Sequence, residues 1–159
     1  PPSAPGPCDW TMPRSTKSFL FPDVNVWLAL TYEGHVHHRA AKGWFDSLGP
    51  SARFFFCRVT QLGLLRLLSS EAVMGHEVLG QTDAWKAYDR WLGDERVSFL
   101  SEPPGLEEAF RAMSHLPHPA PKDWADSYLA AFALTSNLTL VTFDRALQAR
   151  AKQVAVLKP

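Results

Sequence analysis

Short apolar runs alternate with longer segments of helical periodicity along most of this chain, and that alternation limits the folds open to it. The strand-like runs lie at residues 19–21, 54–57, 96–100 and 138–142. In the segments between them, apolar residues recur at helical spacing. Strands that alternate with helices of ten or more residues predict βαβ units. We therefore expect an α/β fold with a central parallel sheet and helices on both faces.

The expected helices are delimited by ordinary start and stop signals. Gly49 and Pro50 end a helix expected at residues 37–48, and Thr82 or Asp83 caps another. The remaining helices are expected at residues 24–32, 60–68, 106–115, 122–135 and 145–152, and an edge strand at residues 154–157.

Length and composition suit one compact domain. A chain of 159 residues buries roughly 68–70% of its unfolded surface, which is enough for a self-supporting core. Residues 1–17 are rich in Pro, Ser and Gly, so we expect a disordered leader followed by a single domain at 18–159. No run approaches the roughly 18 apolar residues of a transmembrane helix, so we expect no membrane association.

Charge and cysteine usage narrow the function classes. A formal net charge of zero argues against a protein that coats nucleic acid through bulk charge, and leaves open a local basic groove. The two cysteines, Cys8 and Cys57, lack the spacing of a metal site. A reducing compartment is the simplest interpretation, so we expect a cytoplasmic protein.

Three aspartates occupy positions that a parallel sheet would bring together. Asp23 follows the first apolar run, Asp144 follows the fourth, and Asp126 lies in the helical segment just before that fourth run. In open α/β sheets, ligands bind beyond the carboxyl ends of the strands, where the strand order reverses. We therefore expect the three carboxylates to meet at one edge of the sheet.

Each aspartate also has a purely structural explanation. Asp23 and Asp144 are both suited to cap the helices that follow them. Asp126 shares a helical stripe with Ala130 and Ala133, a small-residue face suited to close packing, where a carboxylate is costly unless it is paired. Asp123, one turn earlier, is better explained as a first-turn acid, which the helix dipole favours, than as a ligand.

Three carboxylates at one site need a cation or a proton. Two unit charges 4 Å apart repel by ~4 kcal/mol at an effective dielectric constant near 20. Hard oxygen ligands suit Mg²⁺ or Mn²⁺, and a metal-bound water can attack a phosphodiester. The hydroxyl of Thr142 is expected on the same side of its strand as Asp144, two residues later.

The chain resembles a PIN-domain ribonuclease of the VapC toxin type. The resemblance covers residues 18–157 and rests on the order and spacing of several stretches rather than on one motif. These stretches are FPDVNVWLAL at 21–30, HHRAA at 37–41, FCRVTQLGLLRLL at 56–68, WADSYLAAFA at 124–133 and LVTFD at 140–144.

The resemblance implies a Mg²⁺- or Mn²⁺-dependent endoribonuclease, the toxin of a toxin–antitoxin pair. Asp23, Asp126 and Asp144 would be the metal-binding and catalytic acids, with Asn25 and Thr142 as supporting polar groups. Asp23 and Asp126 would hold the metal, while Asp144 would bind a second metal or orient the attacking water. The partners would be the RNA substrate, a VapB-like antitoxin and a second copy of the chain in a homodimer.

One position departs from the family pattern. The family usually places a glutamate on the helix after the second strand, where this chain has Gly63, and no acid follows until Glu71. The alternative function is therefore a catalytically weak PIN-like module that binds RNA or protein. A phosphatase with Asp23 as nucleophile is a weaker third hypothesis, because such a site needs a second aspartate where this chain has Asn25.

Two further groups invite a functional interpretation. His35, His37 and His38 resemble a metal cluster, but without a fourth ligand they are better explained as solvated surface residues, and contact of His37 or His38 with substrate phosphate is a weaker alternative. The aromatic stripe that includes Trp85 and Tyr88 is interpreted as core, with any exposed part as a surface for the second copy or the antitoxin.

Overall fold

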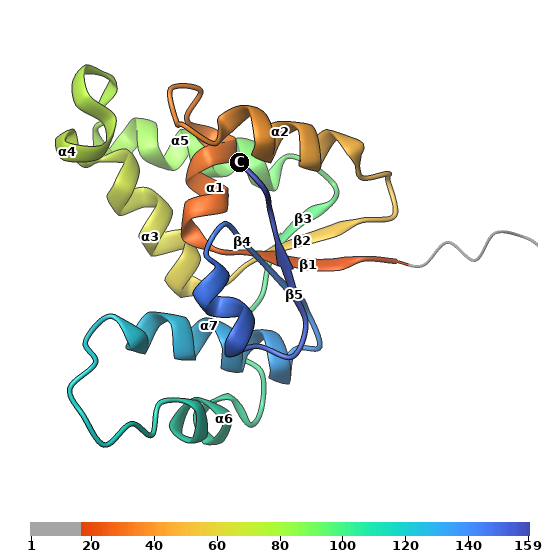
Figure 1. Ribbon diagram of the computed structural model, residues 1–159. Helices are drawn as coiled ribbons and strands as arrows, with labels where there is room; N and C mark the ends of the chain where they lie inside the picture. The colour runs from red at the N-terminus through yellow and green to blue at the C-terminus, as the bar shows by residue number, and fades with distance from the viewer. Residues whose placement is uncertain (1–16) are drawn as a thin grey trace, which may run out of the picture.

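The computed structural model describes residues 17–159. Apart from Lys17, the predicted leader, with its Cys8, lies outside the described residues. Within the described part, five strands form one sheet in the order β3-β2-β1-β4-β5, and every pairing is parallel (Figure 1). The strands are β1 (Phe19–Pro22), β2 (Arg53–Phe56), β3 (Val97–Phe99), β4 (Thr139–Thr142) and β5 (Val154–Val156).

Helices cover both faces of this sheet, which confirms the predicted α/β architecture. Figure 1 shows α6 and α7 on one side, and α1, α2, α3 and α5 on the other. The helices are α1 (Val24–Thr31), α2 (His38–Ser47), α3 (Arg58–Leu68), α4 (Glu71–Met74), α5 (Gln81–Leu92), α6 (Leu106–Met113) and α7 (Asp123–Thr135), with two 3-10 segments, η1 (Gly75–Glu77) and η2 (Arg145–Ala149).

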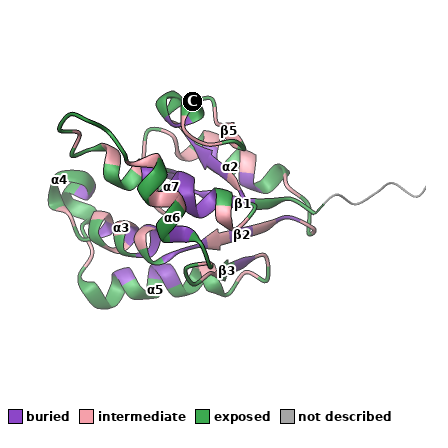
Figure 2. Ribbon diagram, turned by 90° about the horizontal axis from the view of Figure 1, so that it is seen from below, coloured by how far each residue is buried: buried purple, intermediate pink, exposed green. Residues whose placement is uncertain are grey.

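The two faces of the sheet carry separate apolar clusters. Leu20 joins the cluster under α1, α3 and α5, while its neighbour Phe21 joins the cluster under α6 and α7. Val141 and Leu140 divide between the clusters in the same way, because successive side chains of a strand point to opposite faces. Figure 2 shows the buried residues along the strands and on the sheet-facing sides of the helices. Full burial of each such side chain stabilises the fold by roughly 1.5–3 kcal/mol.

The strand order reverses between β1 and β4. From β1 the chain builds outward through β2 to β3, then returns to place β4 against the other side of β1. The two strands pair in register, with Pro22 opposite Val141. The residues that follow the two strands, Asp23 and Phe143, therefore lie at the same edge of the sheet. In α/β proteins, ligands bind at this edge, where the strand order reverses.

Three local predictions are wrong. Helix α5 begins at Gln81 with Gly80 at its N-cap, so Thr82 and Asp83 lie in its first turn and do not cap it. The segment expected as a helix at 145–152 is the 3-10 segment η2. The short helix α4 was not expected, because its four residues are too few to display a helical period.

No helix among residues 17–159 combines the length and the apolar character needed to cross a bilayer.

Candidate metal centre

Asp23 stands at the junction of β1 and α1, where its side chain contacts both the start of the helix and the end of β4. Its Oδ1 accepts a hydrogen bond from the Val26 N–H at 2.8 Å, so Asp23 caps α1 as predicted. Its Oδ2 accepts from the Thr142 hydroxyl at 2.5 Å, across the reversal of strand order. Only 5% of the residue is exposed. Asp23 is therefore a buried carboxylate held from two directions.

Burial raises the pKa of Asp23 from an ordinary 3.8 to about 6. The hydrogen bonds from Thr142 and from the Val26 backbone lower this pKa but do not cancel the cost of removing the charge from water. The negative charge of Asp126 raises it further. A carboxyl group with a strongly shifted pKa at a ligand-binding edge is a candidate functional group.

Thr142 connects Asp23 to Asp144. It is fully buried at the end of β4, and its Oγ1 accepts from the Asp144 backbone N–H at 2.9 Å while its own proton goes to Asp23. Asp144 is exposed, and its Oδ1 accepts from the Ala146 N–H at 2.8 Å. That bond makes it the N-cap of η2, as the sequence predicted for the segment that follows it.

Asp126 lies in the first turn of α7, half-buried, on the face that carries Ala130 and Ala133. Both alanines are buried, as the small-residue stripe predicted. Burial is the main cause that raises the pKa of Asp126; the charge of Arg150 lowers it, and that of Asp144 raises it. Asp126 therefore interacts electrostatically with both other aspartates, since its charge also raises the pKa of Asp23.

Arg150 is a charged neighbour of the acids that sequence reasoning missed. Its Nη2 donates to Asp123 Oδ2 at 2.5 Å, and its Nη1 donates to Ser127 Oγ at 3.2 Å. Asp123 is therefore held in an ion pair with Arg150. Nothing in the sequence indicates this pair, because 27 residues separate its members and no periodicity relates them.

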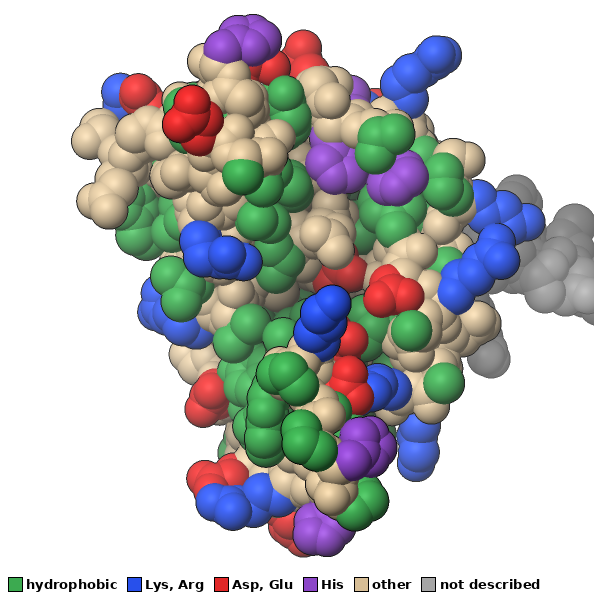
Figure 3. Space-filling view, turned by 60° about the vertical axis from the view of Figure 1, so that its left-hand side comes forward, with side chains coloured by type: hydrophobic (Ala, Val, Ile, Leu, Met, Phe, Trp, Pro, Cys, Tyr) green, Lys and Arg blue, Asp and Glu red, His purple; other side chains and the backbone are tan. Residues whose placement is uncertain are grey.

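The three aspartates do not form a ready metal-binding cluster in the described part of the chain. Across residues 17–159, no three His, Cys, Asp or Glu side chains lie close enough together to hold a metal ion as they stand. Figure 3 shows acidic side chains near the middle of one face, with histidines above them and basic side chains beside them. Carboxylate and hydroxyl oxygens in an open site suit a hydrated Mg²⁺, which keeps several waters and takes one or two protein carboxylates.

A cavity of about 310 Å³ adjoins the acids on the side of α1 and α2. Asn25, exposed in the first turn of α1, and Asp144 both line it. Asn25 and Asp144 therefore share one cavity, and the supporting role of Asn25 stays a prediction. The remaining lining residues are His35, Val36, His37 and Phe143.

Gly63 is enclosed by its neighbours. It lies on α3, and a Cβ atom built on it would meet Val24 Cγ2 at 2.7 Å and Val24 Cγ1 at 2.9 Å. Val24 directly follows Asp23 in the chain, so Gly63 packs against the residue next to that carboxylate. The close approach of α1 to α3 leaves no room at this position for a longer side chain.

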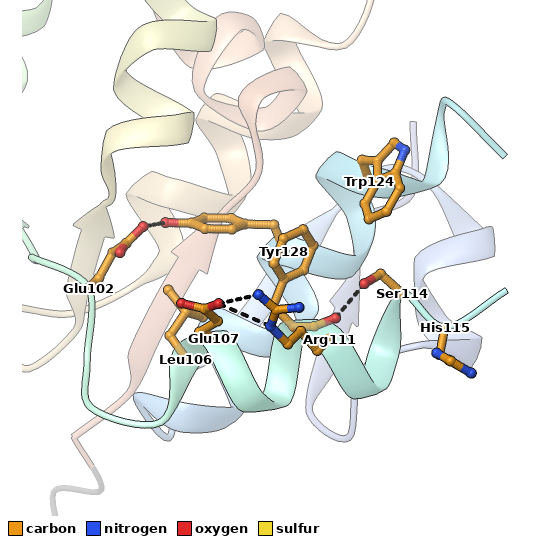
Figure 4. A pocket seen from close by; sticks show the side chains of 9 residues that line it. Glu102, Leu106, Glu107, Arg111, Ser114, His115, Trp124 and Tyr128 are labelled. Atoms are coloured by element: carbon orange, nitrogen blue, oxygen red, sulfur yellow. Dashed lines mark hydrogen bonds and ion pairs between the residues drawn. The ribbon is translucent and has the colours of Figure 1, made fainter.

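A second cavity, of about 710 Å³, lies between α6 and α7 (Figure 4). Its aromatic lining comes from Phe110, Trp124 and Tyr128, and the Tyr128 hydroxyl donates to Glu102 Oε1 at 2.8 Å. None of the three candidate aspartates lines this cavity. Trp124 and Tyr128 lie two residues either side of Asp126, which places them on the far side of the helix from it.

Comparisons with known proteins agree on one family. The PIN domain family matches residues 20–153. Ribonuclease VapC41 of Mycobacterium tuberculosis is 47% identical over 131 residues, which cover 80% of this chain and 90% of the relative. Ribonuclease VapC29 of the same species is 30% identical over 140 residues, covering 86% of this chain and 94% of the relative.

Solved structures repeat the fold. The crystal structure of Mycobacterium tuberculosis VapC20, a Sarcin-Ricin loop cleaving toxin, matches with a TM-score of 0.62 and 20% identity, over 87% of this chain and 99% of that one. VapBC2 from Rickettsia felis, bound to a DNA fragment from its promoter, matches with a TM-score of 0.62 and 11% identity, over 87% and 98%. At these identities the likeness concerns the fold alone.

Proposed function

The chain belongs to the PIN domain family, and from that premise we propose that it is an endoribonuclease, the toxin of a toxin–antitoxin pair. Its similarity to Ribonuclease VapC41 extends over nine-tenths of that relative, so the proposal concerns a whole domain rather than a fragment. The observation that carries the proposal is the buried Asp23 carboxylate at the reversal of strand order. Thr142 ties it to Asp144, and Asp126 lies within electrostatic reach.

The activity would depend on a divalent metal, Mg²⁺ or Mn²⁺, held by Asp23 and Asp126. The raised pKa of each carboxyl group supports this assignment, because a nearby cation would offset the burial and repulsion that raise it. When bound, such a metal lowers the pKa of a coordinated water and stabilises the charge that develops on a phosphodiester.

The side chains around the metal would have separate roles in positioning the acids, the water and the RNA. Thr142 holds Asp23 Oδ2 and the Asp144 backbone in fixed positions. Asp144, whose Oδ2 lies outside the capping bond, would orient the attacking water or bind a second metal. Asn25 would contact the substrate at the rim of the site. Arg150 keeps Asp123 paired, which limits the negative charge that faces the RNA.

The partners would be RNA, a VapB-like antitoxin and a second copy of the chain, in the cytoplasm. Toxin–antitoxin complexes are among the solved structures that share the fold, including VapBC-1 of Haemophilus influenzae, with a TM-score of 0.60. The antitoxin would protect the cell from the ribonuclease until it is released.

The second candidate function is a catalytically weak module that binds RNA or protein. It is favoured by Gly63, because the carboxylate that the family usually supplies at this position is missing and Val24 fills the space. A site with one carboxylate fewer would bind the metal less tightly.

A cleavage assay on total RNA separates these functions. Antitoxin-free protein is incubated with RNA in Mg²⁺ or in a chelator, and wild type is compared with Asp126→Asn and with the control Asp89→Asn, whose carboxylate is exposed on α5. We expect metal-dependent cleavage that Asp126→Asn slows by roughly 100-fold or more, since a metal contributes several kcal/mol of transition-state stabilisation. Varied RNAs that stay intact in Mg²⁺ would overturn the enzymatic function, and RNA binding that survives Asp126→Asn and the chelator would support the binding module.

A further inference from the structure

Three histidines, with three different environments, lie where the chain turns from α1 into α2, and His38 is the first residue of α2. They were predicted to be solvated surface residues, but all three are half-buried. His38 Nδ1 lies 2.7 Å from the Ala29 carbonyl oxygen, which can only accept, so this nitrogen donates and ties the loop to α1. His35 Nδ1 accepts from the His37 backbone N–H at 3.1 Å. These two bonds fix the loop on both sides of its tip.

The third histidine forms an aromatic pair beside the acids. The ring of His37 stacks on Phe143, with centroids 4.5 Å apart and an angle of 27° between the planes. Phe143 lies between Thr142 and Asp144 in the chain. The stacked pair is therefore attached directly to two residues of the candidate metal centre, and its position relative to the acids is set by the end of β4.

The stacked pair forms one wall of the cavity of about 310 Å³ that Asn25 and Asp144 also line. Val36, at the tip of the loop, is 85% exposed and lines the same cavity. Such a volume lies at the lower end of the roughly 300–1,000 Å³ of small-molecule sites. It suits a single nucleotide unit and is too small for a duplex.

The chemistry of the lining favours a nucleobase over a phosphate. The lining contains no Lys or Arg, and it includes the carboxylate of Asp144, which repels phosphate. Burial, followed by the charges of His37 and His38, lowers the pKa of His35, so its ring is neutral. Aromatic faces and an exposed valine are suited to the flat face of a base, which stacks on aromatic side chains whatever its identity.

Two polar groups are placed to read the edge of such a base. Because His35 Nδ1 accepts from the backbone, the proton of the neutral ring is on Nε2, which is then a donor. Asn25, which lines the same cavity, offers both a donor and an acceptor.

We propose that this cavity is a subsite for one unpaired nucleobase of the RNA, stacked on His37 next to the phosphodiester that the acids would cleave. The subsite rests on the proposed function, since the base belongs to the same RNA. It would make the enzyme select single-stranded segments, and it would strengthen RNA binding equally in the ground state and the transition state.

Substitutions of His37 test the subsite by separating stacking from charge. His37 is the N-cap of α2 without a side-chain capping bond, so its replacement leaves the start of that helix intact. A short labelled single-stranded RNA of mixed sequence is the probe, and its affinity is measured by fluorescence anisotropy in Mg²⁺ with cleavage followed in parallel. The control is His76→Ala, an exposed histidine on η1.

We expect His37→Ala to weaken binding and raise KM about tenfold, the loss of one stacked base, while kcat changes little. His37→Phe keeps the stack and should behave like wild type, whereas His37→Lys should resemble His37→Ala. The reverse order, in which Lys preserves affinity and Phe does not, would establish a phosphate contact and overturn the proposal. Equal affinity of wild type and His37→Ala would overturn it too.

Abasic RNAs locate the base and separate this proposal from the proposed function. Removing the base that occupies the subsite should cost wild type the same factor as His37→Ala, and should cost the His37→Ala variant nothing more. The subsite is refuted if base removal and His37→Ala lower the affinity independently at every abasic position, so that the combined loss is the product of the two separate losses. If wild type binds with this pattern but does not cleave, the enzymatic function fails and the subsite stands. If wild type cleaves, and His37→Ala binds and cleaves RNA equally well, the subsite fails and the enzymatic function stands.

Discussion

The Asp23 carboxylate receives two hydrogen bonds, yet its burial favours the protonated form. Its pKa of about 6 in the folded protein exceeds the ordinary 3.8 of the unfolded chain. Between these values the folded state binds the proton more tightly, so this group's contribution to stability falls as the pH rises from about 4 to 6. The difference corresponds to about 3 kcal/mol of unfolding free energy that is missing above pH 6.

Asp23→Asn should therefore stabilise the metal-free protein above pH 6 by about 1–3 kcal/mol, because the uncharged amide avoids that cost and still offers an acceptor to Val26. Urea unfolding in a chelator at several pH values between 4 and 8 measures this. The loss of wild-type stability between pH 4 and 6 should be reduced in Asp23→Asn and unchanged in the control Asp89→Asn. Parallel pH profiles for wild type and Asp23→Asn would show that Asp23 titrates normally.

At the scale of elements, the contact between α1 and α3 determines what Gly63 can become. Glycine inside a helix is ordinarily less stable than alanine by roughly 1 kcal/mol. Here a Cβ atom would come within 3 Å of Val24, whose branched side chain has little freedom to move away. Gly43, on α2, has open space around it instead.

The two glycines should respond to alanine in opposite directions. We expect Gly63→Ala to destabilise the protein by about 1–3 kcal/mol through overpacking, and Gly43→Ala to stabilise it by roughly 0.5–1 kcal/mol. Chemical denaturation compares both with wild type. Adding Val24→Ala should recover much of the loss in Gly63→Ala. If the two alanine variants were equally stable, α1 and α3 would be packed less closely than the structure shows.

The elements differ in how far the sequence predicts them. The strands and the buried stripe of α7 follow from local periodicity, and Thr142 was placed beside Asp144 by the two-residue period of β4. Periodicity does not report distances between elements. The closure of α1 over Gly63 and the pairing of Arg150 with Asp123 depend on contacts across the fold, so the sequence predicted neither. The partial burial of the histidines was missed because it depends on a hydrogen bond to Ala29 and on stacking against Phe143, which both lie outside that segment of the chain.

At the scale of the molecule, exposed apolar side chains on α3 and α5 support the proposed homodimer. Leu62 is 63% exposed and Trp85 is 46% exposed, although the core residue Tyr88 from the same aromatic stripe is buried. Helices α3 and α5 pack against each other on one face of the sheet. A second copy that docked on these two helices would bury both apolar side chains.

We expect the protein to sediment as a dimer and Leu62→Glu to raise the dimer dissociation constant at least about tenfold, since it removes roughly 1.5–3 kcal/mol of apolar burial and adds a charge to the interface. The matched control is Leu134→Glu, which changes a 40% exposed leucine on α7, across the sheet. A dimer that survives Leu62→Glu but dissociates in Leu134→Glu would move the interface to the other face.

The Thr142 hydroxyl has a consequence beyond holding two residues in place. It has a single proton, and that proton points toward Asp23 while the Asp144 N–H points toward the hydroxyl oxygen. The two bond dipoles therefore lie in series, and each polarises the next in the same sense. The Asp144 N–H dipole thereby strengthens the hydrogen bond that the Thr142 hydroxyl donates to the Asp23 carboxylate, at the end of another strand. Two positions 119 residues apart in the chain are coupled by the orientation of one O–H bond.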